Sequence, residues 1–144
     1  MHGAELDAAI SEVLRLFPEV SAAWLFGSVA RGEARPGSDL DVALLFRSRG
    51  NTVLDNYELL GRIAAQLEAV APGRRIDLVS IAAQGPVFQH RVLSEGRLVH
   101  DPEPSRRVDF ESDAYVRYFD FAPIHERATR VAARGFVDWL ESRK

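Results

Sequence analysis

The chain has 144 residues, a net charge of −3 and no cysteine. A chain of this length forms one domain with a sizeable buried core. The absence of cysteine excludes a disulfide framework and a thiolate metal site, and the charge gives no general attraction to nucleic acid. No apolar run approaches the ~18 residues that suggest a membrane span, and the N-terminus lacks the layout of a signal peptide. These features predict a cytoplasmic protein that binds neither membranes nor, directly, nucleic acid.

The first part of the chain predicts a helix followed by a buried strand. Apolar residues recur at helical spacing over residues 6–17, and the pattern ends near Pro18. Residues 20–26 then predict a strand, which Gly27 and Ser28 halt. A turn-rich passage follows, marked by Gly32, Pro36 and Gly37.

A second strand and a longer helix come next. Residues 40–46 are continuously apolar after Asp41, as expected for a strand that is covered on both faces. A polar tract over residues 47–51 leads into the helix, which Pro72 and Gly73 end. The predicted buried stripe of this helix consists of Leu54, Leu60, Ile63, Ala64 and Leu67.

The remaining pattern completes an α/β fold. Residues 75–81 predict a third strand, Pro86 starts a short helix that Gly96 closes, and residues 97–100 are a candidate fourth strand. Residues 101–105 form the clearest linker. Two helical patterns, broken by Pro123, follow it, and the second carries an apolar stripe over residues 124–140. We therefore expect a three- to four-stranded mixed sheet flanked by helices, with a helical C-terminal tail.

In terms of domain organisation, residues 1–104 form the predicted core. Residues 105–144 are helices that pack on this core or on a partner, so that the chain is a single domain overall. If the stripe over residues 124–140 is exposed, it would favour association into oligomers.

Gly27 and Ser28 are candidate phosphate-binding residues. A glycine at the end of a strand lets the backbone approach a ligand closely and adopt angles that other residues avoid. The serine hydroxyl would donate a hydrogen bond to a phosphate oxygen, and helical N–H groups after Ser28 would face the same place. A Gly-Ser pair is also common in ordinary turns, so these two residues alone do not decide the chemistry.

Two carboxylates one residue apart change this interpretation. Asp39 and Asp41 lie at positions i and i+2, which face the same side of an extended strand about 6–7 Å apart. Like charges so close together repel unless a cation lies between them. Magnesium prefers a few carboxylates together with substrate phosphates and water. The alternative is a solvated acidic start to the strand, which the apolar run after Asp41 argues against.

Asp77 is the third candidate carboxylate. A lone aspartate within a strand often pairs with a nearby arginine, here Arg74 or Arg75. If the third strand lies beside the second, Asp77 would instead join Asp39 and Asp41. There it could ligate a metal near the acceptor and help to remove the acceptor's proton.

The pattern G-S-x10-D-x-D with a later strand aspartate resembles the nucleotidyltransferase superfamily typified by DNA polymerase beta. The run S-V-A-R-G, the short chain and the compact tail are similar to its minimal nucleotidyltransferases (MNT). Among these, the chain is most similar to the MntA-type adenylyltransferase antitoxins of HEPN/MNT toxin–antitoxin pairs. The resemblance covers residues 24–101 and, more loosely, the C-terminal helices.

The resemblance implies a role for each site residue. Gly27 and Ser28 would bind the triphosphate of ATP, and Asp39 and Asp41 would hold two Mg²⁺ ions, with Mn²⁺ as an alternative. Asp77 would ligate the acceptor-side metal. The implied reaction transfers AMP to a hydroxyl, expected to be a tyrosine, of a partner HEPN toxin and silences it. Separately, the charge of Arg31 suits the phosphates, although a salt bridge on the helix surface is an equal alternative.

Two other functions remain open at this stage. One is nucleotidyl transfer to a small molecule such as an aminoglycoside, for which only the tail after Asp101 is available as an acceptor-binding region. The other is a binding antitoxin that occludes its partner without catalysis.

Overall fold

The computed structural model describes residues 3–33, 35, 37–47 and 53–143. Pro36 and residues 48–51 of the predicted polar tract lie outside the described residues, and so does the side chain of Leu54. In chain order the elements are α1 (Gly3–Leu14), β1 (Val20–Phe26), α2 (Gly27–Ala30), β2 (Leu40–Phe46), α3 (Val53–Val70), β3 (Ile76–Ser80), the 3-10 turn η1 (Ile81–Ala83), α4 (Pro86–Glu95), β4 (Arg97–His100) and α5 (Pro104–Ser142).

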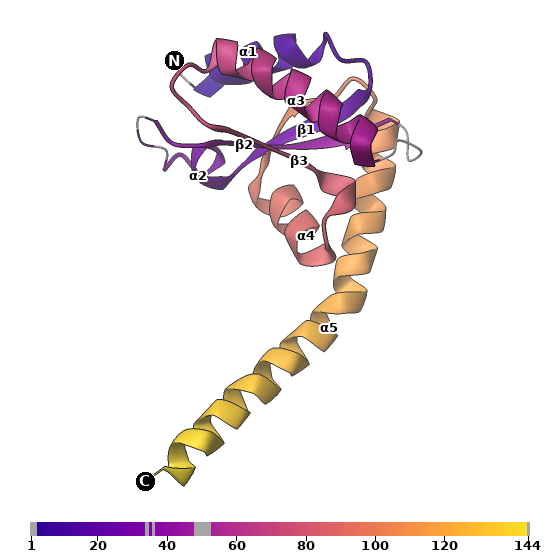
Figure 1. Ribbon diagram of the computed structural model, residues 1–144. Helices are drawn as coiled ribbons and strands as arrows, with labels where there is room; N and C mark the ends of the chain where they lie inside the picture. The colour runs from indigo at the N-terminus through magenta and orange to yellow at the C-terminus, as the bar shows by residue number, and fades with distance from the viewer. Residues whose placement is uncertain (1–2, 34, 36, 48–52, 144) are drawn as a thin grey trace.

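The four strands form one mixed sheet, which confirms the predicted α/β fold. Their order is β3-β2-β1-β4. Strand β1 is antiparallel to both β2 and β4, whereas β2 and β3 run parallel. The two central strands are buried along almost their whole length, because helices cover the sheet on both sides. Figure 1 shows α1 and α3 on one face and α4 with the beginning of α5 on the other.

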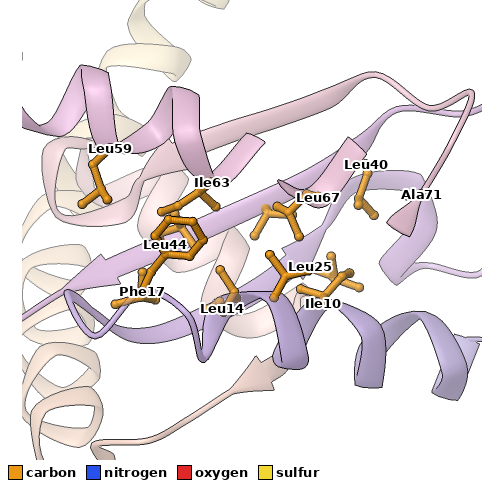
Figure 2. Close-up of a cluster of buried hydrophobic side chains, with 14 of the residues drawn as sticks. Ile10, Leu14, Phe17, Leu25, Leu40, Leu44, Leu59, Ile63, Leu67 and Ala71 are labelled. Atoms are coloured by element: carbon orange, nitrogen blue, oxygen red, sulfur yellow. The ribbon is translucent and has the colours of Figure 1, made fainter. Parts of the chain in front are cut away.

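The larger part of the core lies between the sheet and helices α1 and α3 (Figure 2). Side chains spaced three or four residues apart on these helices meet alternate side chains of β1 and β2. On α3 the buried residues are Leu59, Ile63 and Leu67. The predicted stripe was therefore correct for Ile63 and Leu67, whereas Leu60 is only partly buried and Leu59 takes the more enclosed position.

The second part of the core lies under α4 and the first turns of α5. Trp24 of β1 is 2% exposed, and its ring centroid lies 6.5 Å from that of Phe110 on α5. Val92 of α4 and Ala114 of α5 complete this cluster. The beginning of α5 is therefore part of the core layer.

The prediction of two C-terminal helices separated at Pro123 is wrong, because α5 is one continuous helix of 39 residues. A proline within a helix removes one N–H donor and crowds the preceding turn, so that a helix either kinks or ends there. Here the helix continues. Residues 127–134 are rich in alanine and arginine, which favour helix formation. Figure 1 shows α5 changing direction partway along and extending beyond the sheet.

The linker predicted at residues 101–105 is short and held in place. Glu103 accepts a hydrogen bond of 3.0 Å from the Ser21 hydroxyl and forms an ion pair of 3.4 Å with Arg47. Arg107 pairs with Asp101 at 2.9 Å and with Glu111 at 3.0 Å. These contacts fix the start of α5 to one end of the sheet. Within the described residues, none of the helices is both long enough and apolar enough to cross a membrane.

Candidate active site

Two aspartates lie side by side at the start of the parallel strand pair. The register of β2 and β3 places Asp41 directly opposite Asp77. Residues paired in this way lie on adjacent strands about 4.8 Å apart and point to the same face of the sheet. That face is the one covered further along by α4 and α5, because Ala43 and Leu45 of β2 contribute to the cluster under those helices. Asp39, two residues before Asp41, is exposed just ahead of the strand.

Gly27 lies against this pair of aspartates. It follows Phe26, the β1 partner of Asp41, and has a φ of 75°, a conformation that favours glycine. A Cβ atom at Gly27 would overlap the Asp41 carboxylate. The turn that ends β1 therefore lies so close to the Asp41 carboxylate that no side chain fits between them.

The electrostatics of Asp41 follow from this crowding. Partial burial raises the pKa of the Asp41 carboxyl, and the charges of Asp77 and Asp39 raise this pKa further. A hydrogen bond between the carboxyls of Asp41 and Asp77 acts in the same direction, whereas the Arg31 guanidinium lowers the pKa of Asp41. Asp77 and Asp39 thus act on Asp41 in the same direction, and Arg31 partly offsets their effect on the pKa of Asp41.

The remaining predicted site residues lie around the same turn. Ser28 is half-buried in α2, and Arg31 ends this helix with an exposed side chain that donates to Glu33 over 3.1 Å. Such an exposed pair contributes little stability, so it leaves Arg31 available to other anions. Among the described residues no ion pair joins Asp77 to Arg74 or Arg75. Arg74 instead donates to the Ser38 carbonyl over 3.4 Å.

The chemistry of these side chains suits a hard divalent cation. Three carboxylates with mutual repulsion are the oxygen donors that magnesium prefers. In the part of the chain that the structure describes, no three acidic or histidine side chains are already spread around a common point as a metal cage. Burial and the charges of Asp77 and Asp39 raise the pKa of Asp41, and a bound divalent cation would offset this crowding of negative charge.

Sequence reasoning missed the residues on α4 that face the same turn. Phe88, Arg91 and Glu95 line a cavity together with Phe26, Gly27 and Arg31. Their spacing of three and four residues shows that they share one face of a helix. Nothing in the local sequence indicates which side of the sheet that helix covers.

A parallel pair of strands with facing aspartates beside a glycine-serine turn defines a class of protein, the nucleotidyltransferases with a polymerase-beta-like fold. Comparison with known families agrees. The family described as polymerase beta, nucleotidyltransferase, matches residues 8–105, well over half of the chain. The chain therefore belongs to this family.

Two relatives have substantial sequence identity. A protein of Methanocaldococcus jannaschii, named as a protein adenylyltransferase, is 34% identical over 76 residues, which are 53% of this chain and 75% of the relative. The solved structure of a minimal nucleotidyltransferase is 39% identical, with a TM-score of 0.52 over 67% of this chain and 94% of that one.

More distant solved structures share the fold over a greater length. A chain from a toxin–antitoxin crystal structure with AMP-PNP has a TM-score of 0.64 at 23% identity, covering 91% of this chain and 97% of that one. A chain from the complex of a tri-AMPylated Shewanella oneidensis HEPN toxin with its MNT antitoxin has a TM-score of 0.62 at 20% identity, covering 94% and 98%. The likeness to these two extends into α5, beyond the part that the family description covers.

Proposed function

We propose that this protein transfers AMP from ATP to a hydroxyl group, a tyrosine hydroxyl, on a partner protein of the HEPN toxin class, and so acts as an antitoxin. The observation that carries the proposal is the register of Asp41 with Asp77 beside Gly27. It brings Asp41, Asp77 and the turn at Gly27 to one place, which supports a common role for them in the transfer. The relative named as a protein adenylyltransferase supports AMP as the transferred group. The complexes with the same fold support a toxin as the acceptor.

Asp39 and Asp41 would hold Mg²⁺ or Mn²⁺ with the help of Asp77. When bound, two such ions neutralise the triphosphate and make the acceptor hydroxyl more acidic. A bound cation would counteract the repulsion that raises the pKa of Asp41, because opposite charge lowers the pKa of an acid.

The chain's own residues would bind and orient the two substrates. The backbone of Gly27 and the hydroxyl of Ser28 would donate to phosphate oxygens, and Arg31 would offset phosphate charge. The acceptor oxygen would form a bond to the α-phosphorus while the bond from this phosphorus to the α–β bridging oxygen breaks and pyrophosphate leaves. The Asp77 carboxylate, on the acceptor side, would take the hydroxyl proton.

The second half of α5 offers a surface for the partner. We define the distal face as Val131, Phe136, Trp139 and Leu140, which are between 45% and 67% exposed. Large apolar side chains grouped in this way mark sites of protein association. The proposed partner covers this face while its acceptor hydroxyl reaches the acids of the sheet.

Mass spectrometry of the partner tests the proposal. After incubation with Mg-ATP, we expect the intact partner to gain the mass of one or more AMP units. The double variant Asp39→Asn/Asp41→Asn should leave the partner unmodified, whereas Asp109→Asn/Glu68→Gln, which removes two exposed charges elsewhere, should act as the wild type. A partner that stays unmodified although ATP binding is confirmed would contradict the proposal.

The distal face also favours a second candidate, neutralisation by contact alone. This face lies on α5, away from the three aspartates in sequence, so it could bind a partner without catalysis. The same double variant separates the two candidates in a toxicity assay. Loss of neutralisation with partner binding intact supports catalysis, and retained neutralisation supports occlusion.

A further inference from the structure

We refer to Asp39, Asp41 and Asp77 as the acid cluster. A cavity of about 180 Å³ adjoins this cluster at Gly27. Gly27 belongs to both places, because it lines the cavity and its Cα lies against the Asp41 carboxylate. The walls come from the end of β1, from α2 and from α4. The lining residues are Phe26, Gly27, Arg31, Phe88, Arg91 and Glu95.

Helix α4 is held firmly in the position that forms one wall. Its buried Gln89 donates to the carbonyls of Ile81 and Gln84, both over 3.0 Å. At its C-terminal end, Gly96 approaches β1 so closely that a Cβ there would lie 2.9 Å from the Leu25 carbonyl oxygen. These contacts hold the face that carries Phe88, Arg91 and Glu95 against the end of β1.

Two aromatic side chains, Phe26 and Phe88, form one wall of the cavity and leave no gap between their rings. The rings of Phe26 and Phe88 meet edge to face, with centroids 5.4 Å apart and an interplanar angle of 85°. Since the two rings contact each other, no flat group can insert between them. The apolar part of the cavity therefore supports its shape, while binding falls to the charged side chains.

Those charged side chains favour an anion. Arg31 and Arg91 reach the cavity from α2 and α4, and Glu95 is the one carboxylate among the lining residues. Arg91 is exposed and forms no ion pair with any residue that the structure describes, including Glu95 one turn further along α4. A guanidinium is a planar fork that binds two phosphate oxygens at once. Two of them beside the phosphate turn match a polyphosphate chain.

We propose that Arg91 is a second phosphate-binding residue, which together with Arg31 grips the β- and γ-phosphates of the nucleotide and then the leaving pyrophosphate. The inference rests on the proposed function in one respect, that a nucleoside triphosphate is the substrate. It places the distal phosphates in the cavity and the α-phosphorus at the aspartates, with Gly27 between them. Arg91 acts on binding of the triphosphate tail and has no role in binding the nucleoside.

The test is a series of ligands that differ in their phosphates. Calorimetric titration with ATP, AMP and inorganic pyrophosphate, each with Mg²⁺, is compared between the wild type, Arg91→Gln and Arg62→Gln. Arg62 is likewise an exposed arginine, on α3 on the other side of the sheet. Arg91→Gln should weaken the binding of ATP and of pyrophosphate about tenfold or more and change the affinity for AMP by no more than about twofold. It should unfold at the same temperature as Arg62→Gln. Arg91→Lys, which keeps the charge but loses the fork, should fall between wild type and Arg91→Gln.

Several results would overturn the inference. Equal weakening of AMP and ATP would show that Arg91 contacts the nucleoside. Binding constants for Arg91→Gln that match those of Arg62→Gln would show that it contacts neither, and a wild type that binds neither ATP nor pyrophosphate would reject the polyphosphate site. The proposed function fails differently: a partner that gains no AMP while the ligand series behaves as expected leaves the role of Arg91 intact.

Discussion

Two constraints act on Gly27 at once, and they are separable. Its φ of 75° lies in the region that side chains with a Cβ avoid, and its Cα faces the Asp41 carboxylate with no space between. The first constraint concerns the stability of the turn. The second concerns the position of a candidate metal ligand. Gly32 has only the first, with a φ of 71° and no neighbouring atom within 4 Å of the place that a Cβ would take.

Replacing each of these glycines by alanine separates the two effects. We expect Gly27→Ala and Gly32→Ala each to lose about 1–2 kcal/mol of unfolding free energy, since both force alanine into the left-handed region. Only Gly27→Ala should also displace Asp41 and reduce AMP transfer, by about 100-fold or more. Urea unfolding and a transfer assay measure the two quantities. Equal activity of the two variants would show that the contact with Asp41 is unimportant.

Asp41 gives the metal-free protein a pH dependence whose sign is fixed. Its pKa is raised in the folded state, first by burial and then by Asp77 and Asp39, so the folded chain holds this proton more tightly than the unfolded chain. The stabilising contribution is complete below the ordinary pKa of an aspartate and is lost as the pH rises through the raised value. Near neutral pH, the charged cluster therefore destabilises the metal-free fold.

The variant Asp41→Asn should remove this dependence. In chelator, we expect it to be more stable than the wild type near pH 7, by less than about 1 kcal/mol because the site is open to solvent. The difference should vanish near pH 3, and Mg²⁺ should stabilise the wild type more than the variant. Thermal unfolding across pH, with Asp109→Asn as a control of equal charge, measures this. A variant less stable than the wild type at pH 7 would contradict the assigned repulsion.

Local sequence was enough to predict that the three aspartates lie near one another, but not that Arg91 lies beside Gly27. Asp39 and Asp41 belong to a short motif whose spacing keeps them close together, with Asp41 in β2 and Asp39 exposed just ahead of it. Asp77 needed one further assumption, that its strand lies beside β2, and the register shows that it does. Arg91 lies near Gly27 because α4 packs against β1. The two segments are far apart in the sequence, so the residue spacing within each of them does not predict this contact.

At the scale of elements, the strands were predicted more accurately than the last helix. Strands β1, β2 and β4 begin and end at the predicted residues, since apolar runs bounded by glycine and charge leave little choice. Helix α5 was predicted as two pieces because Pro123 is a strong local stop signal. The helix propensity of the residues on either side of the proline outweighed that signal. A rule that treats each residue separately does not capture this effect.

Two phenylalanines on α5 report how much of this helix belongs to the core. Phe110 is 5% exposed and packs on Trp24, whereas Phe119, nine residues later, is 65% exposed. We expect Phe110→Ala to cost about 3–5 kcal/mol of unfolding free energy, as for a buried aromatic side chain. Phe119→Ala should cost less than about 1 kcal/mol. Chemical denaturation measures both, and similar values would mean that α5 does not separate into a core part and an exposed part.

At the scale of the whole molecule, the proposed site of transfer and the proposed partner surface lie on different parts of one chain. The aspartates, the turn at Gly27 and the cavity gather at one end of the sheet, while the distal face lies on the part of α5 that extends beyond it (Figure 1). A protein acceptor can contact the aspartates and the distal face at once, whereas a small molecule is too small to span them. The separation predicts that binding of the partner and transfer of AMP can be disrupted independently.

Trp139 is the residue on which this prediction is best tested. It is 51% exposed, its ring stacks on Phe136 with centroids 6.1 Å apart, and the Arg143 guanidinium lies 4.6 Å from its centroid. Exposed tryptophan with neighbouring arginine is the composition of energetic centres in protein interfaces. We expect Trp139→Ser to weaken partner binding at least about thirtyfold, with the unfolding free energy unchanged within about 0.5 kcal/mol.

The matched control is Leu16→Ser, because Leu16 is a similarly exposed apolar residue, 66% exposed, two residues after the end of α1. Calorimetric titration of the partner and of ATP into each variant measures the two activities separately. ATP binding should be equal in both variants, since neither residue lines the cavity or the acid cluster. Unchanged partner binding by Trp139→Ser would contradict docking on the distal face. If sedimentation then showed that this variant had lost self-association, a second copy of the chain would be the occupant of that face.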